Sequence, residues 1–331
     1  MSDSKGSIWV IAEQLEGRIP LVSFQLIGQA RKLVDEMGGS VGVVLLGNDF
    51  DGQINQLIDA GGDTIYLGEA PEFEFYQAEI FTEVIVSLAQ EKGPEILLLG
   101  STFMGRELAP LIAASLETGL TAHCVDLTLD ENHILEQRIP AYKGMMTIIC
   151  PEKRPQMATV ARGVFPTPQL DETRTGEVYP IEPPRGEELR IKTLEIVRKE
   201  PEGVNLESAT TVVAGGAGAG TLEGWQDIEA LAETLNAALG STRPAVDEGW
   251  TELETMIGQS GKMVSPDLYI GVGLSGELQH MVGITGAKLM VAINNDPKSP
   301  VFEQVDIGIV EDCRQFVPIL IEKIKKYKED I

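Results

Sequence analysis

Residues 240–280, GSTRPAVDEGWTELETMIGQSGKMVSPDLYIGVGLSGELQH, form the stretch that decides how the second half of the chain folds. Its apolar run LYIGV, residues 268–272, has the length and composition of a buried β-strand. The polar patch SGELQH, residues 275–280, follows where a parallel strand would end and a helix begin. Unpaired N–H groups and the helix dipole favour negative charge there. A second polar patch, IGQSG at residues 257–261, precedes the strand. The stretch therefore predicts a site that binds a phosphate or an electron-rich ring edge.

A strand, a glycine turn and a helical pattern open the second half. Residues 210–213 (TTVV) lead into AGGAGAG at 214–220, and an amphipathic helical pattern follows at 224–239. This opening resembles a dinucleotide-binding turn, but tight packing of a helix on a strand needs glycine as well. Two more strands and a closing helix are expected at residues 289–293, 307–310 and 313–327.

Polar side chains follow the expected strands at their carboxyl ends, namely Ser275, Asn294 and Asp312. In an open parallel sheet these ends meet at one rim, where ligands bind. Asn294 can bond an adenine or ribose edge, and Asp312 can bond a hydroxyl. Because the rim offers amides, hydroxyls and His280 but no nucleophile, it favours holding a redox cofactor over bond-breaking chemistry.

The first half also alternates strands with helices. Strands are expected at residues 8–12, 41–46, 64–67 and 96–99, and helices at 25–37, 54–60, 76–91 and 105–116. This spacing indicates βαβ units and a parallel sheet covered on both faces. Shorter runs predict further strands at 124–129, 134–138, 145–150, 155–160 and 194–197. The fold class is therefore α/β, with two domains that each have a mainly parallel sheet flanked by helices.

A length of 331 residues favours two domains over one core. Glu, Pro, Gly and Asn interrupt the periodicity at residues 199–208, which predicts a linker. We therefore expect an N-terminal α/β domain at residues 1–203 and a C-terminal domain at residues 204–331.

Other candidate sites are weaker. The loop GSTFMGR, residues 100–106, could hold a phosphate, but helix capping by Ser101 or Thr102 is the simpler explanation. His123 and His133 have no partner at metal-ligand spacing, which favours structural or surface roles. The sequence shows no Ser/His/Asp, HExxH or Walker pattern, so no catalytic or metal-binding residue is predicted.

Composition excludes several partners. A net charge of −25 with no long basic run argues against nucleic acid and anionic membrane surfaces. Cys124, Cys150 and Cys313 lie far apart without a CxxC, which predicts reduced thiols. The N-terminus lacks the pattern of a signal or transit peptide, and no apolar run reaches about 18 residues. We expect a cytoplasmic protein that does not span a membrane.

Several motifs, in the right order, resemble the alpha subunit of electron transfer flavoprotein, the FixB-like family, over nearly the whole chain. They are GRELAP (105–110), TGLTA (118–122), RPQMATV (154–160), PDLYIGVGLSGELQH (266–280) and AINNDP (292–297). The resemblance implies a Rossmann-like C-terminal domain that binds FAD, and an obligate beta subunit that the N-terminal domain contacts. It implies an electron carrier without bond-breaking chemistry, which serves a flavin dehydrogenase, such as acyl-CoA dehydrogenase, and in some cases a quinone oxidoreductase. Flavin-based electron bifurcation stays open.

The resemblance also implies the FAD contacts. Thr242 and Arg243 match a Ser-Arg pair, whose guanidinium lies beside the isoalloxazine. A V-G-Q-T element, whose hydroxyl approaches flavin N5, is matched by Ile257, Gly258, Gln259 and Ser260. The loop and helix start that carry the pyrophosphate, with His280 near the flavin pyrimidine carbonyl, are matched by Ser275, Gly276, Glu277, Leu278, Gln279 and His280. Asn294 and Asp312 match contacts on the adenosine side.

Two positions depart from the family pattern. Ala217 replaces the Arg of a G-G-R-G turn, which removes one positive contact to FAD. The tripeptide Ala161-Arg162-Gly163 stands where the family has R-P-G. A freestanding adenine-nucleotide module without redox work would use the same rim and is the alternative. A third class, an NAD-dependent dehydrogenase, lacks a visible acid/base pair.

Overall fold

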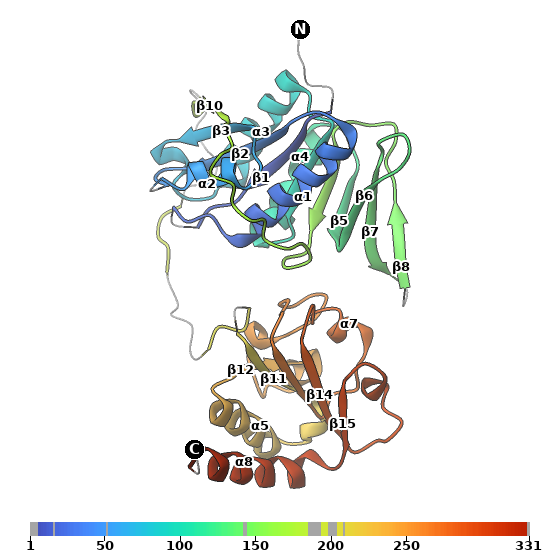
Figure 1. The fold of residues 1–331 in the computed structure, drawn as a ribbon. Helices are drawn as coiled ribbons and strands as arrows, with labels where there is room; N and C mark the ends of the chain where they lie inside the picture. The colour runs from blue at the N-terminus through green and yellow to red at the C-terminus, as the bar shows by residue number, and fades with distance from the viewer. Residues whose placement is uncertain are drawn as a thin grey trace. The chain divides into compact units, whose positions relative to one another are not determined.

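The computed structural model describes residues 6–15, 17–50, 52–141, 144–184, 193–197, 204–207 and 209–329. The chain divides into two compact units, Met1–Val197 and Arg198–Ile331. Figure 1 shows that each unit is built around its own sheet. Residue 203 at the predicted boundary and the linker residues 199–203 and 208 lie outside the described residues, so the boundary stays a prediction.

A seven-stranded parallel sheet forms the first unit, in the order β10-β3-β2-β1-β4-β9-β5. Its strands are β1 (Ile8–Ala12), β2 (Val41–Gly47), β3 (Thr64–Glu69), β4 (Ile96–Gly100), β5 (Leu120–Cys124), β9 (Gln156–Val160) and β10 (Glu177–Pro180). The helices are α1 (Leu21–Met37), α2 (Ile54–Asp59), α3 (Ala78–Lys92) and α4 (Phe103–Ser115). An antiparallel sheet of β6 (Asp126–Leu129), β7 (Leu135–Ala141) and β8 (Gly144–Ile148) completes the unit. The α/β prediction is confirmed.

Helices cover this sheet on both faces. Ile8 and Val10 of β1 pack in one apolar cluster with α1, whereas Trp9 and Ile11 pack in another with α3 and α4. All five residues of β1 are buried. A continuous apolar run such as IWVIA therefore marks a central parallel strand, because both faces of the strand meet helices.

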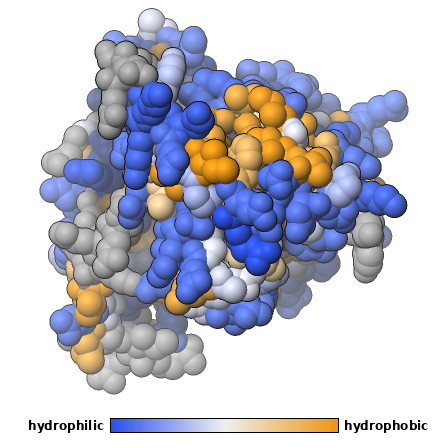
Figure 2. Space-filling view, turned by 90° about the horizontal axis from the view of Figure 1, so that it is seen from below, coloured by the Kyte–Doolittle hydropathy of each residue, from blue (hydrophilic) through white to orange (hydrophobic). Residues whose placement is uncertain are grey.

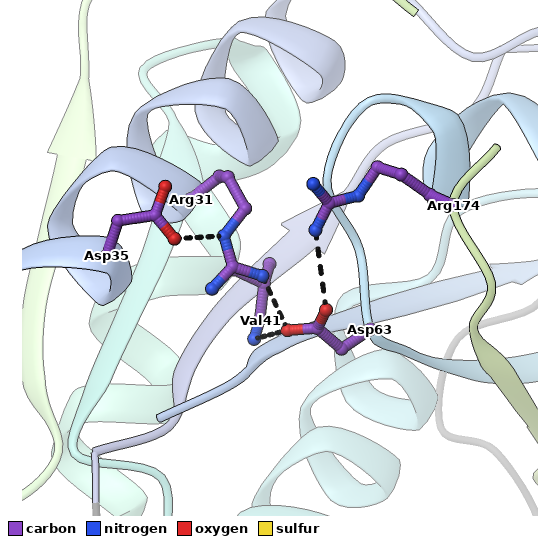
Figure 3. Close-up of polar contacts among 5 residues, drawn as sticks. All are labelled: Arg31, Asp35, Val41, Asp63 and Arg174. Carbon is purple, nitrogen blue, oxygen red and sulfur yellow. Dashed lines mark hydrogen bonds and ion pairs between the residues drawn. The ribbon is translucent and has the colours of Figure 1, made fainter. Parts of the chain in front are cut away.

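An ion-pair network, drawn in Figure 3, ties α1 to the sheet. Arg31 Nη1 lies 2.7 Å from Asp63 Oδ2, which also accepts a 2.8 Å hydrogen bond from Val41 N at the start of β2. Arg174 Nη2 lies 3.6 Å from Asp63 Oδ1, and Arg31 Nε pairs with Asp35 at 2.9 Å. Asp63 thus links α1, β2 and the chain that leads into β10.

The second unit has a five-stranded parallel sheet in the order β12-β11-β13-β14-β15. The order reverses between β11 and β13, so their carboxyl ends flank the crevice where open α/β sheets bind ligands. The elements are β11 (Thr211–Gly215), α5 (Leu222–Leu235), β12 (Ala238–Ser241), α6 (Arg243–Asp247), β13 (Leu268–Val272), α7 (Leu278–Met281), β14 (Leu289–Asn294), β15 (Ile307–Val310) and α8 (Cys313–Glu329).

The two faces of this sheet are covered differently. On one face, Trp225 of α5 and Val317 of α8 pack with Val213 and Ile270. On the other face, Tyr269 packs with residues of irregular segments, such as Ile257. Figure 1 shows α5 and α8 side by side. Chain segments without long helices therefore cover the second face, and they reach the carboxyl rim.

Several sequence predictions need correction. The single strand expected at residues 124–129 is divided, since β5 ends at Cys124 and β6, in the other sheet, begins at Asp126. The helix expected at residues 224–239 ends at Leu235, because Asn236 is left-handed (φ 53°) and β12 follows. No strand forms at residues 194–197, where Leu194 is 91% exposed and finds no sheet to pair with. The unpredicted strand β10 is an exposed edge that ends in proline, a residue that breaks the usual strand signal.

The face drawn in Figure 2, seen from below Figure 1, is mostly hydrophilic, with a large apolar area at the upper right and a smaller one at the lower left. In the second unit, β15 is an edge strand on which Ile307 and Val310 are about half exposed. Among the described residues, no helix is both long and apolar enough to cross a membrane.

Candidate functional site

A cavity of about 500 Å³ lies at the carboxyl rim of the second sheet. Its wall combines the turn after β11, the start of α6, residues 256–260, the loop after β13 and the ends of β14 and β15. The volume lies within the range of small-molecule and cofactor sites. The rim predicted from the strand ends is therefore a real cavity.

Twelve of the fourteen predicted site residues line this cavity: Thr242, Arg243, Ile257, Gly258, Ser260, Ser275, Gly276, Glu277, Gln279, His280, Asn294 and Asp312. Gln259 and Leu278 do not line it. The backbone N–H of Gln259 instead donates to Gln279 O at 2.7 Å, and the Leu278 side chain is 37% exposed. Sequence reasoning missed Gly218, Pro244, Met256, Gly273, Leu274, Asn295 and Cys313, which also line it. Gly218 lies in the glycine turn and Gly273, Leu274 and Asn295 lie in the quoted motifs, whereas only the position beside predicted residues pointed to Pro244, Met256 and Cys313.

The glycine turn after β11 packs against the turn after β13. Gly218 N donates to Gly273 O at 2.8 Å. A Cβ on Gly216 would lie 2.5 Å from Gly273 O, and one on Gly218 would lie 2.6 Å from Gly273 Cα. Close approach of two backbones therefore accounts for these two glycines, and it brings both turns to the cavity.

Residues 257–261 interlock with α7 in the same way. Gly258 has a φ of +139°, and a Cβ there would lie 2.3 Å from Gln279 O. Together with the bond from Gln259 N, this contact places the backbone of residues 257–260 directly against the end of α7. A substitution at Gly258 would force the two sides of the cavity apart.

His280 is buried in this wall, and both of its ring nitrogens have protein partners. Nδ1 lies 3.0 Å from Ile257 O, and Nε2 lies 2.7 Å from the hydroxyl of Tyr269. Burial lowers the pKa of His280 to about 4, and the hydrogen bond to the Ile257 carbonyl acts in the opposite direction as the smaller cause. The ring is therefore neutral at neutral pH, and a new hydrogen bond to a ligand would require one of these contacts to break.

Thr242 and Arg243 stand at the start of α6 and differ in their surroundings. Thr242 is buried, and its hydroxyl has no hydrogen-bond partner among the described residues. The Arg243 side chain is 71% exposed, with Nε 3.6 Å from Asp247 Oδ2. Thr242 thus keeps a hydrogen-bonding capacity that the described residues leave unused, and Arg243 can bring positive charge to the same cavity.

Asn294 and Asp312 hold the far side of the rim. Asn294 Nδ2 donates to Leu274 O at 2.8 Å, which ties β14 to the loop after β13. Asp312 accepts hydrogen bonds from Arg314 Nη2 (2.7 Å) and Nε (3.1 Å), and this pairing lowers the pKa of Asp312. Both side chains line the cavity, so their predicted adenosine contacts stay predictions that this geometry allows.

The other glycine loop, residues 100–106, belongs to the first unit. Thr102 Oγ1 accepts from Gly105 N at 2.9 Å and donates to Glu13 Oε1 at 2.8 Å. This is a helix cap, as the simpler interpretation of the sequence holds. Within the described residues, no cluster of three His, Cys, Asp or Glu side chains could hold a metal ion.

The residues present fit the FAD implied by the sequence resemblance. A buried hydroxyl without a protein partner is costly unless a ligand or water satisfies it, and Thr242, whose hydroxyl has none among the described residues, belongs to the cavity lining. The crevice lies where the strand order reverses, as in other nucleotide-binding sheets. Arg243 supplies the charge that a reduced, anionic ring or a phosphate requires.

Comparison with known proteins agrees with this geometry. The Electron transfer flavoprotein domain matches residues 8–185, and the Electron transfer flavoprotein FAD-binding domain matches residues 205–285. An electron transfer flavoprotein subunit alpha from Thermoanaerobacterium thermosaccharolyticum is 43% identical, over 99% of this chain and 100% of the relative. Protein FixB from Clostridium saccharobutylicum is 39% identical, over 98% of each chain.

A further relative carries a more specific name. Acryloyl-CoA reductase electron transfer subunit beta from Anaerotignum propionicum is 33% identical, over 97% of this chain and 96% of the relative. Both domains occur here in sequence, and the relatives match from end to end. This chain therefore belongs to the electron transfer flavoprotein alpha-subunit family and binds FAD.

Proposed function

We propose that this chain pairs with an electron transfer flavoprotein beta subunit and carries single electrons on FAD. In this proposal a flavin dehydrogenase, such as an acyl-CoA dehydrogenase, exchanges electrons with the pair, and a downstream acceptor, such as a quinone oxidoreductase, completes the transfer. The name of the Anaerotignum propionicum relative supports a partner that acts on acyl-CoA compounds. The same electron carrier could also work within a complex that performs flavin-based electron bifurcation. We also propose a cytoplasmic location, which cell fractionation would test.

The cavity at the rim of the second sheet is the observation that carries the proposal. It brings together Thr242, whose buried hydroxyl has no partner among the described residues, and the cation Arg243. The Cys313 thiol on the lining donates to Gly218 O, and burial raises its pKa. Such a lining binds and tunes a cofactor rather than breaking bonds. We propose that the predicted residues on this lining contact FAD, and that Gln259 and Leu278 support the wall from behind.

Bound FAD supplies the one-electron chemistry, and the chain's own residues set the conditions for it. Arg243 lowers the free energy of negative charge in the cavity, because its guanidinium always carries a proton. The Thr242 hydroxyl, which has no partner among the described residues, is available for one hydrogen bond to the cofactor. The interlocked turns at Gly218 and Gly273 hold the cavity in shape, so it needs little rearrangement when charge changes.

Co-purification with the beta subunit, followed by a visible spectrum, tests the proposal. The proposal predicts a yellow heterodimer whose flavin is reduced by a flavin dehydrogenase and reoxidised by an acceptor. A colourless heterodimer that retains only an adenine nucleotide would instead favour the non-redox nucleotide module.

A further inference from the structure

Tyr269 lies directly behind the cavity. It stands on β13, its side chain is fully buried, and it does not itself line the cavity. Its hydroxyl lies 2.7 Å from His280 Nε2, and the two ring centroids are 6.3 Å apart. A buried hydroxyl that meets a single ring nitrogen at this distance makes a strong, specific contact.

The partners of His280 determine which ring nitrogen carries the proton. A backbone carbonyl can only accept, so Nδ1 must donate to Ile257 O across 3.0 Å. In the neutral ring Nε2 is then a bare lone pair, and the Tyr269 hydroxyl must donate to it. The hydrogen bonds therefore run in one direction, from Tyr269 through His280 to Ile257.

This chain of bonds connects three parts of the second unit. Tyr269 belongs to β13, His280 to α7, and Ile257 begins the segment that continues into Gly258 and Ser260. Ile257, Gly258, Ser260 and His280 all line the cavity. The Tyr269 hydroxyl therefore acts on the cavity through residues that line it, without touching a ligand.

We propose that Tyr269 is a positioning residue of the FAD site, because its hydroxyl donates to Nε2 of the neutral His280 ring and thereby fixes that ring and the wall at residues 257–260. The inference rests on the proposed function only where it names FAD as the ligand. Its chemical consequence is a neutral imidazole at the cavity. Among the described residues that line the cavity, Arg243 is then the one that carries positive charge.

The surroundings of His280 support a neutral ring. Burial is the larger cause of the lowered pKa of His280. The charged side chains on the same cavity are Arg243, Glu277 and Asp312, and none of them is hydrogen-bonded to the ring in the described structure. Donation from Tyr269 to the lone pair favours the neutral form further, since a proton on Nε2 would remove that acceptor.

Tyr269→Phe in the FAD-loaded heterodimer tests the proposal, because it removes only the hydroxyl. The chain has three histidines, so ¹⁵N-histidine labelling gives three imidazoles from it, and a His280→Asn variant assigns the signal of interest. We expect a protonated Nδ1, a bare Nε2 and no titration between about pH 5.5 and 8 in the unsubstituted chain. In Tyr269→Phe the His280 pKa should rise, because the neutral ring loses its donor, and the Nε2 chemical shift should change while Nδ1 stays protonated against Ile257 O. Tyr327→Phe, at a 68% exposed position, should change neither signal.

Affinity for FAD provides the second measurement. Tyr269→Phe should raise the Kd about fivefold, as expected for one buried hydrogen bond, and Tyr327→Phe should leave it unchanged. In a His280→Asn background, whose amide can still donate to Ile257 O, Tyr269→Phe should add little. That non-additive result is the signature of a residue that acts through its neighbour.

Three outcomes would overturn the proposal: an Nε2–H tautomer in the unsubstituted chain, an unchanged His280 signal in Tyr269→Phe, or fully additive effects in the double variant. A simple loss of packing would weaken FAD binding without changing the Nε2 shift or the pKa of His280, and it would therefore count against positioning. If the heterodimer bound no FAD, the proposed function would fail, while the imidazole signals would still report on Tyr269.

Discussion

At the scale of single residues, Arg243 is the side chain that most directly stabilises negative charge on a ligand in the cavity. Arg243→Ala should lower the flavin potential, because a nearby cation stabilises the reduced, negatively charged ring. A unit charge at this distance in a partly exposed site contributes on the order of 1 kcal/mol, or roughly 40 mV for a one-electron couple. Potentiometric titration of the heterodimer measures the change.

The control for Arg243 is Arg138→Ala, which removes an equally ordinary surface ion pair from the first unit. The flavin reduction potential of the Arg138→Ala heterodimer should match that of the unsubstituted protein. Equal shifts in both variants would mean that net charge alone, rather than proximity to FAD, sets the potential.

Removing the Thr242 hydroxyl should have opposite effects on the stability of the FAD-free chain and on its affinity for FAD. Thr242→Val removes a buried hydroxyl that has no partner among the described residues, so the FAD-free chain should gain about 1 kcal/mol of unfolding free energy. The same change should weaken FAD binding roughly fivefold, because the ligand loses a hydrogen bond. Urea unfolding and flavin fluorescence measure the two effects, and a loss of stability in the free chain would contradict the argument.

At the scale of elements, the cavity depends on two turns that touch backbone to backbone. Gly218→Ala would place a Cβ 2.6 Å from Gly273 Cα, so it should cost about 1–3 kcal/mol of stability and reduce FAD retention. Gly144→Ala is the matched control, since its nearest neighbour would lie 3.9 Å away. Equal losses in the two variants, by thermal unfolding and flavin content, would show that close packing of the turns is not what the site requires.

Sequence patterns predict those elements well where local and tertiary signals agree. β1, β13 and β15 match their predicted bounds residue for residue, because each is a short apolar run bounded by turn residues or acidic residues. The rim of the cavity was predictable because parallel strands share a carboxyl edge. The pairing of Tyr269 with His280 was not predictable, since it depends on how α7 turns back over the sheet.

Strand edges and helix ends are where sequence reasoning fails here. β10 pairs with β3 only because the chain returns to the first sheet, and nothing in EVYP signals such a return. β12 follows α5 after a left-handed Asn236, which a helical pattern running to residue 239 conceals. Both cases depend on contacts between residues far apart in the sequence, which local patterns do not record.

At the scale of the whole molecule, the two units should respond to pH with opposite sign. Burial raises the pKa of Glu13 in the first unit to about 7, so the folded state favours the protonated acid. The free energy of unfolding of this unit should therefore fall by up to about 3 kcal/mol as the pH rises from 4.5 to 7. The lowered pKa of His280 favours the neutral base, so the second unit gains stability as pH rises from about 4 to 6.5.

Native-state hydrogen exchange at β1 and at β13 measures the two responses separately. Glu13→Gln should stabilise β1 at pH 8, have little effect at pH 5, and leave β13 unchanged at both. A constant difference across this range would mean that Glu13 is already ionised in the folded protein.

The account depends most on where FAD sits, and hydrogen–deuterium exchange of the heterodimer with and without FAD tests this directly. We predict that FAD slows exchange at the backbone amides of residues 242–243, 257–260 and 275–280, which surround the cavity. Protection confined to the β4–α4 loop of the first unit, or no protection at the rim of the second sheet, would contradict the account.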